Sequence, residues 1–201
     1  MAKNMTLVEK VQGIIRTPEK FFKSVEKEKS IKPAFVFDAV ITAVSVAISY
    51  VIGLAVGGVF SANTASGVSG VVFNWIFGMI FGFVCVGFFH IFIRLLGGKG
   101  KYLDTYKALI YASAISLLTL VSMVFFGFGL AGMAIGVLSA VAVSIWCLYV
   151  TLKGVSILHK ISMFRAFGAF CIAVFVAGVI AVVLFLIFLW PTIAAAVAAA
   201  A

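Results

Sequence analysis

Charged residues are scarce in this chain, and cysteine, histidine and proline are scarcer still. Of its 201 residues, 65% are hydrophobic and 10% are charged, whereas a soluble domain has about 45–50% apolar and about 25% charged residues. A core of this size cannot bury so large an apolar surplus, so part of it has to face lipid. The composition excludes a water-soluble globular domain and predicts a protein that crosses a membrane several times.

The residues that usually carry chemistry are few and scattered. Cys85, Cys147 and Cys171 lie in apolar runs without a CxxC or Cys/His pattern. We expect them to act as small hydrophobes, and we expect no disulfide, metal or cofactor site. His90 and His159 are the two histidines, and four of the six acidic residues precede residue 34. No nucleophile, base and orienting group can be combined from these residues, so we do not expect an enzyme.

Three long runs contain no charged residue: 39–93, 108–152 and 166–201. A helix needs about 20 residues to cross a hydrocarbon core of roughly 30 Å. The first two runs are each broken once, by small and polar residues at 60–70 and by glycines at 127–132. Each of these two runs therefore holds two spans, and the third holds one.

We predict an all-α polytopic membrane protein with five transmembrane helices. A cytoplasmic amphipathic segment, 1–33, precedes the membrane domain at 34–190, and a low-complexity alanine tail, 191–201, follows it. The predicted spans are about 34–58, 71–96, 107–128, 132–152 and 165–190.

Every basic residue lies in the N-terminal segment or in one of two predicted loops: eight in 1–33, four in the loop 94–107 and three in the loop 153–165. Five crossings bring these segments to one side of the membrane. The positive-inside rule then predicts a cytoplasmic N-terminus and an external C-terminus. Anionic headgroups attract such segments by roughly 1 kcal/mol per basic residue. The cations expected to contact anionic lipid are Lys20, Lys23, Lys27, Lys99, Lys101, Lys107, Lys160 and Arg165. Topology and lipid contact account for the charge, so no nucleic acid is expected.

Two amphipathic helices are predicted before the first span. Thr6 and Glu9 have capping-box spacing ahead of an apolar stripe, and Thr17 with Pro18 marks a second helix start. Phe21 and Phe22 would share one face of the second helix. This helix could lie in the headgroup plane with its phenylalanines in lipid, or dock on the end of the bundle. We favour the headgroup plane.

Three ionisable residues fall near the cytoplasmic edge of the predicted spans: Asp38, His90 and Arg94. By the helical rise, all three lie within about 10 Å of the edge. We predict that Asp38 pairs with Arg94 or His90 and ties the first span to the second. The alternatives are that the helix N-terminus alone stabilises Asp38, or that Asp38 belongs to an ion or proton site.

Glycine pairs recur with the spacing that lets helices approach closely in lipid. The pairs are Gly53 with Gly57, Gly78 with Gly82, and Gly132 with Gly136. They predict a tightly packed bundle or close contacts between subunits.

The stretch GGKGKYLDTYKALIYASA, 97–114, contains glycines and lysines but not the GxxxxGK[ST] pattern of a phosphate-binding loop. It resembles the loop and following helix of the Yip-domain proteins, which are Ypt/Rab-GTPase-interacting membrane proteins with prokaryotic relatives. TPEKFFKSV (17–25) and LYVTLKGVSILHKISMFRAFGA (148–169) resemble two further parts of the same family.

The resemblance implies a polytopic membrane protein, which in eukaryotes is tied to vesicle traffic and small GTPases. This chain has 33 residues before the first predicted span and lacks the family's Asp-Leu-x-Gly-Pro signature. Both departures argue against a small-GTPase partner and favour a short prokaryotic member. We expect the cell membrane as its location, or the endoplasmic reticulum and Golgi in a eukaryote.

The sequence thus predicts a non-enzymatic scaffold or adaptor that acts through a basic cytoplasmic face. Its partners would be anionic lipids, other membrane proteins or copies of itself. The alternatives are a protein that conducts lipid or small solutes and an accessory subunit of a larger complex. A permeation protein would need a cavity lined by Asn74 or by serines from several spans.

Overall fold

The computed structural model describes residues 5–56, 67–191 and 193, and every regular element in those residues is helical. The helices are α1 (Leu7–Arg16), α2 (Pro18–Val25), α3 (Lys32–Val56), α5 (Gly67–Leu95), α6 (Tyr102–Ser113), η3 (Ala114–Ser116), α7 (Leu117–Phe125), η4 (Phe126–Phe128), α8 (Gly129–His159), α9 (Met163–Leu184) and the π-helical turn η5 (Phe185–Leu189).

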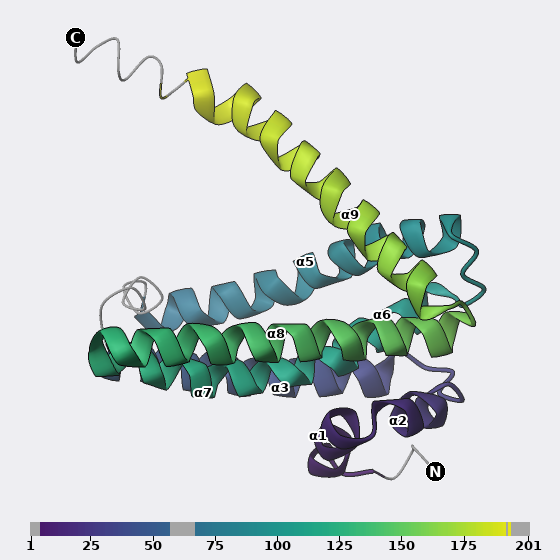
Figure 1. The fold of residues 1–201 in the computed structure, drawn as a ribbon, viewed down its shortest axis with the longest axis horizontal. Helices are drawn as coiled ribbons and strands as arrows, with labels where there is room; N and C mark the ends of the chain where they lie inside the picture. Colours follow the sequence, from purple (N-terminus) through teal and green to yellow (C-terminus); the bar gives the residue numbers. More distant parts are fainter. Residues whose placement is uncertain (1–4, 57–66, 192, 194–201) are drawn as a thin grey trace.

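Helices α3, α7 and α8 run along one axis in an elongated bundle, and α5 packs on α3 at an angle to them (Figure 1). Four continuous helical stretches are long and apolar enough to cross a membrane: Lys32–Val56, Gly67–Leu95, Tyr102–His159 and Met163–Leu189. The third stretch has 58 residues and folds back at Gly129, where φ is +67°. The fold is therefore that of an all-α polytopic membrane protein.

The turn between α7 and α8 depends on two glycines that follow it. A Cβ at Gly132 would collide with the carbonyl oxygen of Phe125, and a Cβ at Gly136 would lie 2.8 Å from the Phe126 ring. These residues let α8 pack directly on α7 and η4. By contrast, a Cβ at Gly78 or Gly82 would meet nothing within 4 Å, so that pair makes no close approach to another part of the chain that the structure describes.

The remaining predicted glycine pair is only partly described. Gly53 is buried in α3, whereas Gly57 lies outside the described residues.

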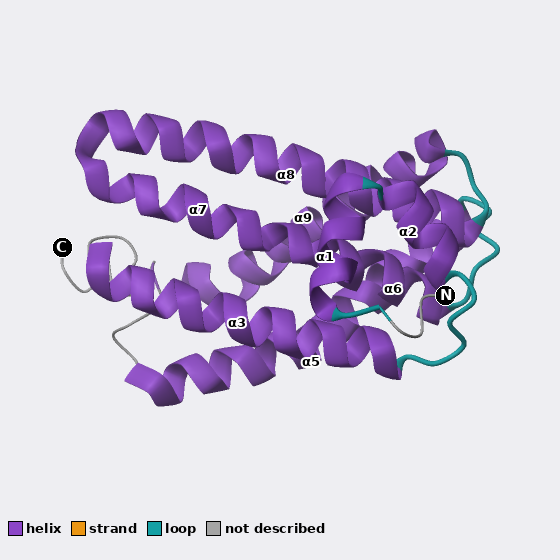
Figure 2. Cartoon of the chain, turned by 90° about the horizontal axis from the view of Figure 1, so that it is seen from below, coloured by secondary structure: helices purple, strands orange, loops and turns teal. Residues whose placement is uncertain are grey.

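The buried core lies at one end of the bundle. Its largest fully buried side chains include Tyr106, Tyr111, Phe22 and Phe37, which come from α6, α2 and α3. Figure 2 shows α1, α2 and α6 gathered at this end together with the connecting loops. The rest of the bundle exposes apolar side chains, as expected for helices that face lipid.

Helix α9 packs against α5 and α8 near its start and then leaves the bundle (Figure 1). The stretch from Val174 to Trp190 covers the second half of α9 and η5. It is apolar and, apart from the half-buried Val176, exposed. Helix α8 is longer than the predicted span, because residues 153–159 continue the helix where a loop was predicted. The helix ends at Lys160, whose backbone is left-handed with φ of 56°.

Candidate functional site

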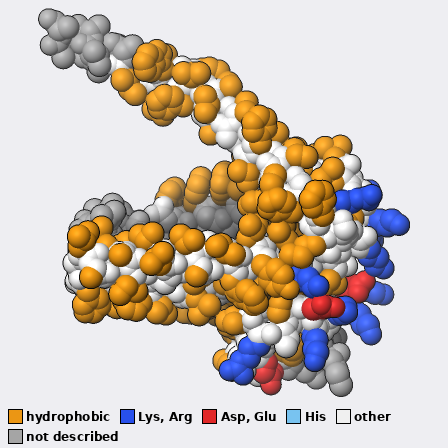
Figure 3. All heavy atoms as spheres, viewed as in Figure 1, with side chains coloured by type: hydrophobic (Ala, Val, Ile, Leu, Met, Phe, Trp, Pro, Cys, Tyr) orange, Lys and Arg blue, Asp and Glu red, His pale blue; other side chains and the backbone are white. Residues whose placement is uncertain are grey.

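Apart from the buried Asp38, the described charged residues lie at one end of the bundle. This end carries α1, α2, α6 and the loops 96–101 and 160–162. We call it the basic end. Figure 3 shows its lysines and arginines in blue, with the apolar body of the bundle free of charge on that face. This grouping makes the basic end the candidate functional site.

Helix α1 begins with the predicted capping box. The Thr6 backbone N–H donates to Glu9 Oε2 at 2.8 Å, and the Glu9 N–H donates to Thr6 Oγ1 at 3.3 Å. Ile14 on the inner face is fully buried. Lys10 is also buried, with its Nζ 5.4 Å from the centre of the Tyr111 ring. At that separation the ring face attracts the ammonium group, so a cation helps to hold α1 in place.

Helix α2 docks on the bundle, so the favoured headgroup-plane hypothesis is wrong for it. Phe22 and Val25 are fully buried and Phe21 is 3% exposed. The Phe22 ring fits against Gly154 of α8, where a Cβ would lie 2.7 Å from the ring. Burying these aromatic side chains against protein removes the apolar face that lipid would otherwise have covered.

Ion pairs fix the outer side of α2. Glu19 accepts from Lys23 at 2.8 Å within the helix, and its second oxygen pairs with Lys153 of α8 at 3.0 Å. Lys23 and Lys153 together lower the pKa of Glu19 to about 2. Glu26 lies 3.6 Å from Lys160 at the end of α8. The pairs join α2 to α8 across the surface.

Lys107 was predicted to contact anionic lipid, and the structure contradicts this, because its side chain is fully buried. Its Nζ pairs with Asp104 at 3.0 Å. The same group donates to the carbonyl oxygens of Val25 and Glu28, each at 3.1 Å. Tyr111 Oη donates to Glu28 Oε2 at 2.9 Å. Helix α6 thus holds the segment that leaves α2.

The other seven cations predicted to contact lipid are all exposed at the basic end: Lys20, Lys23, Lys27, Lys99, Lys101, Lys160 and Arg165. Five of them have no acidic partner among the described residues, whereas Lys23 pairs with Glu19 and Lys160 lies 3.6 Å from Glu26.

The predicted pairing of Asp38 is not formed. Asp38 is buried in α3, but no ion pair or hydrogen bond joins its carboxylate to Arg94 or His90 in the described chain. Arg94 Nη1 donates instead to the carbonyl oxygen of Gly98 at 3.0 Å. His90 Nδ1 lies 2.6 Å from Thr105 Oγ1. The two residues hold the 97–101 loop and α6 rather than α3.

A buried polar chain that the sequence did not indicate links three helices. Thr105 Oγ1 of α6 lies 2.6 Å from His90 Nδ1 of α5 and 2.9 Å from His159 Nε2 of α8. One hydroxyl proton cannot serve both rings, so one imidazole donates to the hydroxyl and the other accepts from it. Sequence reasoning placed His159 in a loop and gave Thr105 no role, because neither stands in a recognisable motif.

The glycine-rich loop packs on this polar chain. A Cβ at Gly98 would lie 3.0 Å from His159 Nδ1, and a Cβ at Gly100 would lie 2.9 Å from it. The backbone N–H of Lys99 donates to the His159 carbonyl oxygen at 3.0 Å. The glycines are needed so that the loop can lie against the end of α8.

A groove of about 380 Å³ opens beside this loop. Its charged lining residues are Lys99, Lys101, Lys160, Glu26 and Asp104. Both Asp104 oxygens are engaged, by the Lys101 N–H and by Lys107. The ammonium groups of Lys99 and Lys101 have no acidic partner within the described residues. The groove therefore carries a positive surplus suited to anionic groups.

This geometry defines a class of protein: a polytopic helical membrane protein with a folded, basic end. A family model, the Yip1 domain, matches residues 13–200. The chain therefore belongs to the Yip1 domain family, as the resemblance predicted. No curated protein and no solved structure matches the chain.

Proposed function

We propose that this Yip1 domain protein is a non-enzymatic scaffold or adaptor that acts through its basic end. In this proposal the five spans place the N-terminus and the basic end in the cytoplasm, at the cell membrane. The partners are anionic lipids, other membrane proteins or copies of the chain. The observation that carries the proposal is the docking of α2, with Phe22 buried on Gly154 and the cations left outside.

Docking gives the basic end a fixed shape. Because Lys107 and Tyr111 hold the chain between α2 and α3, the surface cations stand on a folded platform and not on a loose tail. A partner then meets charges that are already positioned, which lowers the entropy lost on binding. Attraction to anionic groups acts over about 8 Å at physiological ionic strength, so binding should weaken as salt is added.

The groove supplies exposed cations whose charge is not neutralised by a neighbouring carboxylate. Lys99 and Lys101 have no acidic partner among the described residues, whereas Lys23 and Lys153 share Glu19. Lys99 and Lys101 should contribute more to binding than Lys23 and Lys153, because their charge is not already neutralised. The second pair offers a matched comparison, since it removes the same number of charges from the same end.

The test is a pull-down of the full chain in a mild detergent, with identification of the bound proteins and lipids. Anionic lipids should be enriched over zwitterionic ones, and the enrichment should fall in Lys99→Gln/Lys101→Gln. It should fall less in Lys23→Gln/Lys153→Gln. Enrichment that is equal in all three proteins would contradict the role of the groove. Solute flux through reconstituted liposomes, with no bound partner or lipid, would contradict the adaptor function itself.

A further inference from the structure

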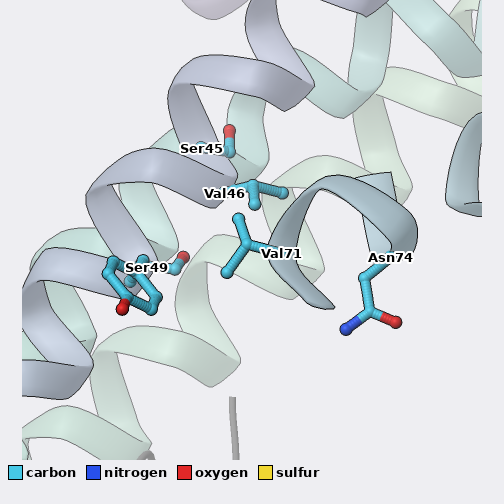
Figure 4. Close-up of a pocket in the computed structure, with 6 residues that line it drawn as sticks. Ser45, Val46, Ser49, Val71 and Asn74 are labelled. Atoms are coloured by element: carbon cyan, nitrogen blue, oxygen red, sulfur yellow. The ribbon is translucent and has the colours of Figure 1, made fainter. Parts of the chain in front are cut away.

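A slot of about 220 Å³ lies between α3 and α5, in the half of the bundle away from the basic end. It is lined by Ser45, Val46, Ser49, Tyr50, Val71 and Asn74. Figure 4 shows the two valines between the helices, with the serines along α3 and Asn74 on α5 at the other rim. The slot is an apolar crevice with two polar rims.

Several of the polar groups in the slot have no partner in the protein. Ser45 Oγ donates to the Ile41 carbonyl oxygen. The side chains of Ser49, Tyr50 and Asn74 make no hydrogen bond within the described residues. In a membrane-spanning helix, lipid tails offer such groups no hydrogen bond, so each unpaired group costs free energy. They are therefore suited to the polar atoms of a ligand.

The depth of the slot indicates where that ligand comes from. Counting along α5 from Arg94 to Asn74 gives about 30 Å, and counting along α3 from Lys32 to Ser45 gives about 20 Å. A hydrocarbon core is roughly 30 Å thick. Both counts pass the middle of the core, so the slot lies in the leaflet opposite the basic end, and a lipid would enter it from that leaflet.

The lining also sets the charge of the ligand. Among the described residues, no Asp, Glu, Lys, Arg or His lines the slot, so a charged headgroup would be desolvated there without a counter-ion from them. Hydroxyl and amide groups both donate and accept, and suit an uncharged polar headgroup. Val46 and Val71 offer an apolar wall to the acyl chain.

The slot is held open by a contact between its walls. Trp75 of α5 donates from Nε1 to Thr42 Oγ1 of α3 at 2.9 Å. Thr42 lies about one turn before Ser45, and Trp75 directly follows Asn74, so the bond fixes the two helices beside the slot, on the side toward the basic end. We propose that the slot binds an uncharged lipid whose headgroup carries two or more hydroxyl or amide groups, entering from the leaflet opposite the basic end.

Thermal unfolding of the full chain in detergent tests the proposal, with monoolein as the probe. Monoolein has two hydroxyls, methyl oleate has the same chain without them, and glycerol has the hydroxyls without the chain. Monoolein should raise the unfolding temperature in a saturable way, with roughly tenfold weaker half-saturation for methyl oleate. Glycerol should give no saturable rise in the same concentration range. Equal responses to monoolein and methyl oleate, or to monoolein and glycerol, would overturn the proposal.

Variants locate the binding site. Asn74→Leu and Ser49→Ala should each weaken the response to monoolein by several-fold. Ser144→Ala, whose hydroxyl lies on α8 and donates to the Ala140 carbonyl oxygen, should leave it unchanged. Val71→Phe fills the slot with an apolar ring and should abolish the response while the protein still unfolds cooperatively. An unchanged response in a folded Val71→Phe protein would place the lipid elsewhere and refute the proposal.

Discussion

Phe22 and Gly154 form the contact that holds the N-terminal helices on the bundle. The Phe22 ring is fully buried, and a Cβ at position 154 would lie 2.7 Å from its Cζ atom. The ring therefore occupies the space that any other residue at 154 would need. Because α2 also carries or borders much of the outward-facing charge, this contact sets the shape of the basic end.

Gly154→Ala is expected to destabilise the docking of α2 on α8. An added methyl group in a packed interface costs about 1–3 kcal/mol, because neither the ring nor the helix can move far. The unfolding temperature should fall, and proteolysis after the lysines of α2 should become faster. Gly78→Ala is the matched control, since a Cβ there meets nothing within 4 Å. Equal effects of the two changes would contradict the account of docking.

Lys107→Met should be among the most damaging single changes at the basic end. It leaves the Asp104 carboxylate without its ion pair and removes the donor to the Val25 and Glu28 carbonyl oxygens. Breaking a buried pair of this kind costs about 3–5 kcal/mol. Thermal or denaturant unfolding measures the loss. Lys99→Met removes an exposed lysine and should change stability little, so a comparable loss there would argue against a special role for Lys107.

Thr105→Val tests the polar chain between the two histidines. Valine has the shape of threonine but no hydroxyl, so His90 Nδ1 and His159 Nε2 both lose their partner. Leaving buried polar groups unpaired costs about 1–3 kcal/mol each. Thr105→Ser keeps the hydroxyl and should retain most of the stability. If serine and valine were equally destabilising, packing and not hydrogen bonding would explain the site.

Glu19 should contribute to the acid sensitivity of the docked helix. Its pKa is lowered from 4.5 to about 2 in the folded protein by Lys23 and Lys153. A lowered pKa favours the folded state above pH 4.5, and this contribution disappears as the pH falls toward 2. Unfolding temperatures of the parent chain and Glu19→Gln should therefore differ at pH 7 and converge near pH 2. The pairs are exposed, so salt should reduce the difference; a difference that grows in acid would contradict the assignment.

Local signals in the sequence predicted the helices well. The capping box of Thr6 and Glu9 and the Thr17–Pro18 start mark the beginnings of α1 and α2 as the structure has them. The apolar runs predicted the all-α membrane class in the same way. Such features depend on residues only a few positions apart in the chain, so a local sequence pattern is enough to predict them.

The contacts of the basic end could not be predicted, because they join distant positions. Lys107 and Val25 are 82 residues apart in the chain, and Thr105 and His159 are 54 apart. In sequence, Lys107 has the same surroundings as an exposed lysine beside a span. Two of its partners in the structure, Val25 and Glu28, come from a distant part of the chain. The end of α8 was misplaced for a related reason, since Lys153 was taken to start a loop and pairs with Glu19 inside a continuing helix.

Labelling of a single cysteine tests the central claim most directly. Lys99→Cys, in a chain whose three native cysteines are replaced, puts one thiol at the groove of the basic end. A membrane-impermeant maleimide is added to intact cells and to inside-out vesicles. The account predicts labelling only in the vesicles, with the basic end in the cytoplasm. Labelling in intact cells would place the basic end outside, and the proposed adaptor function would then be wrong.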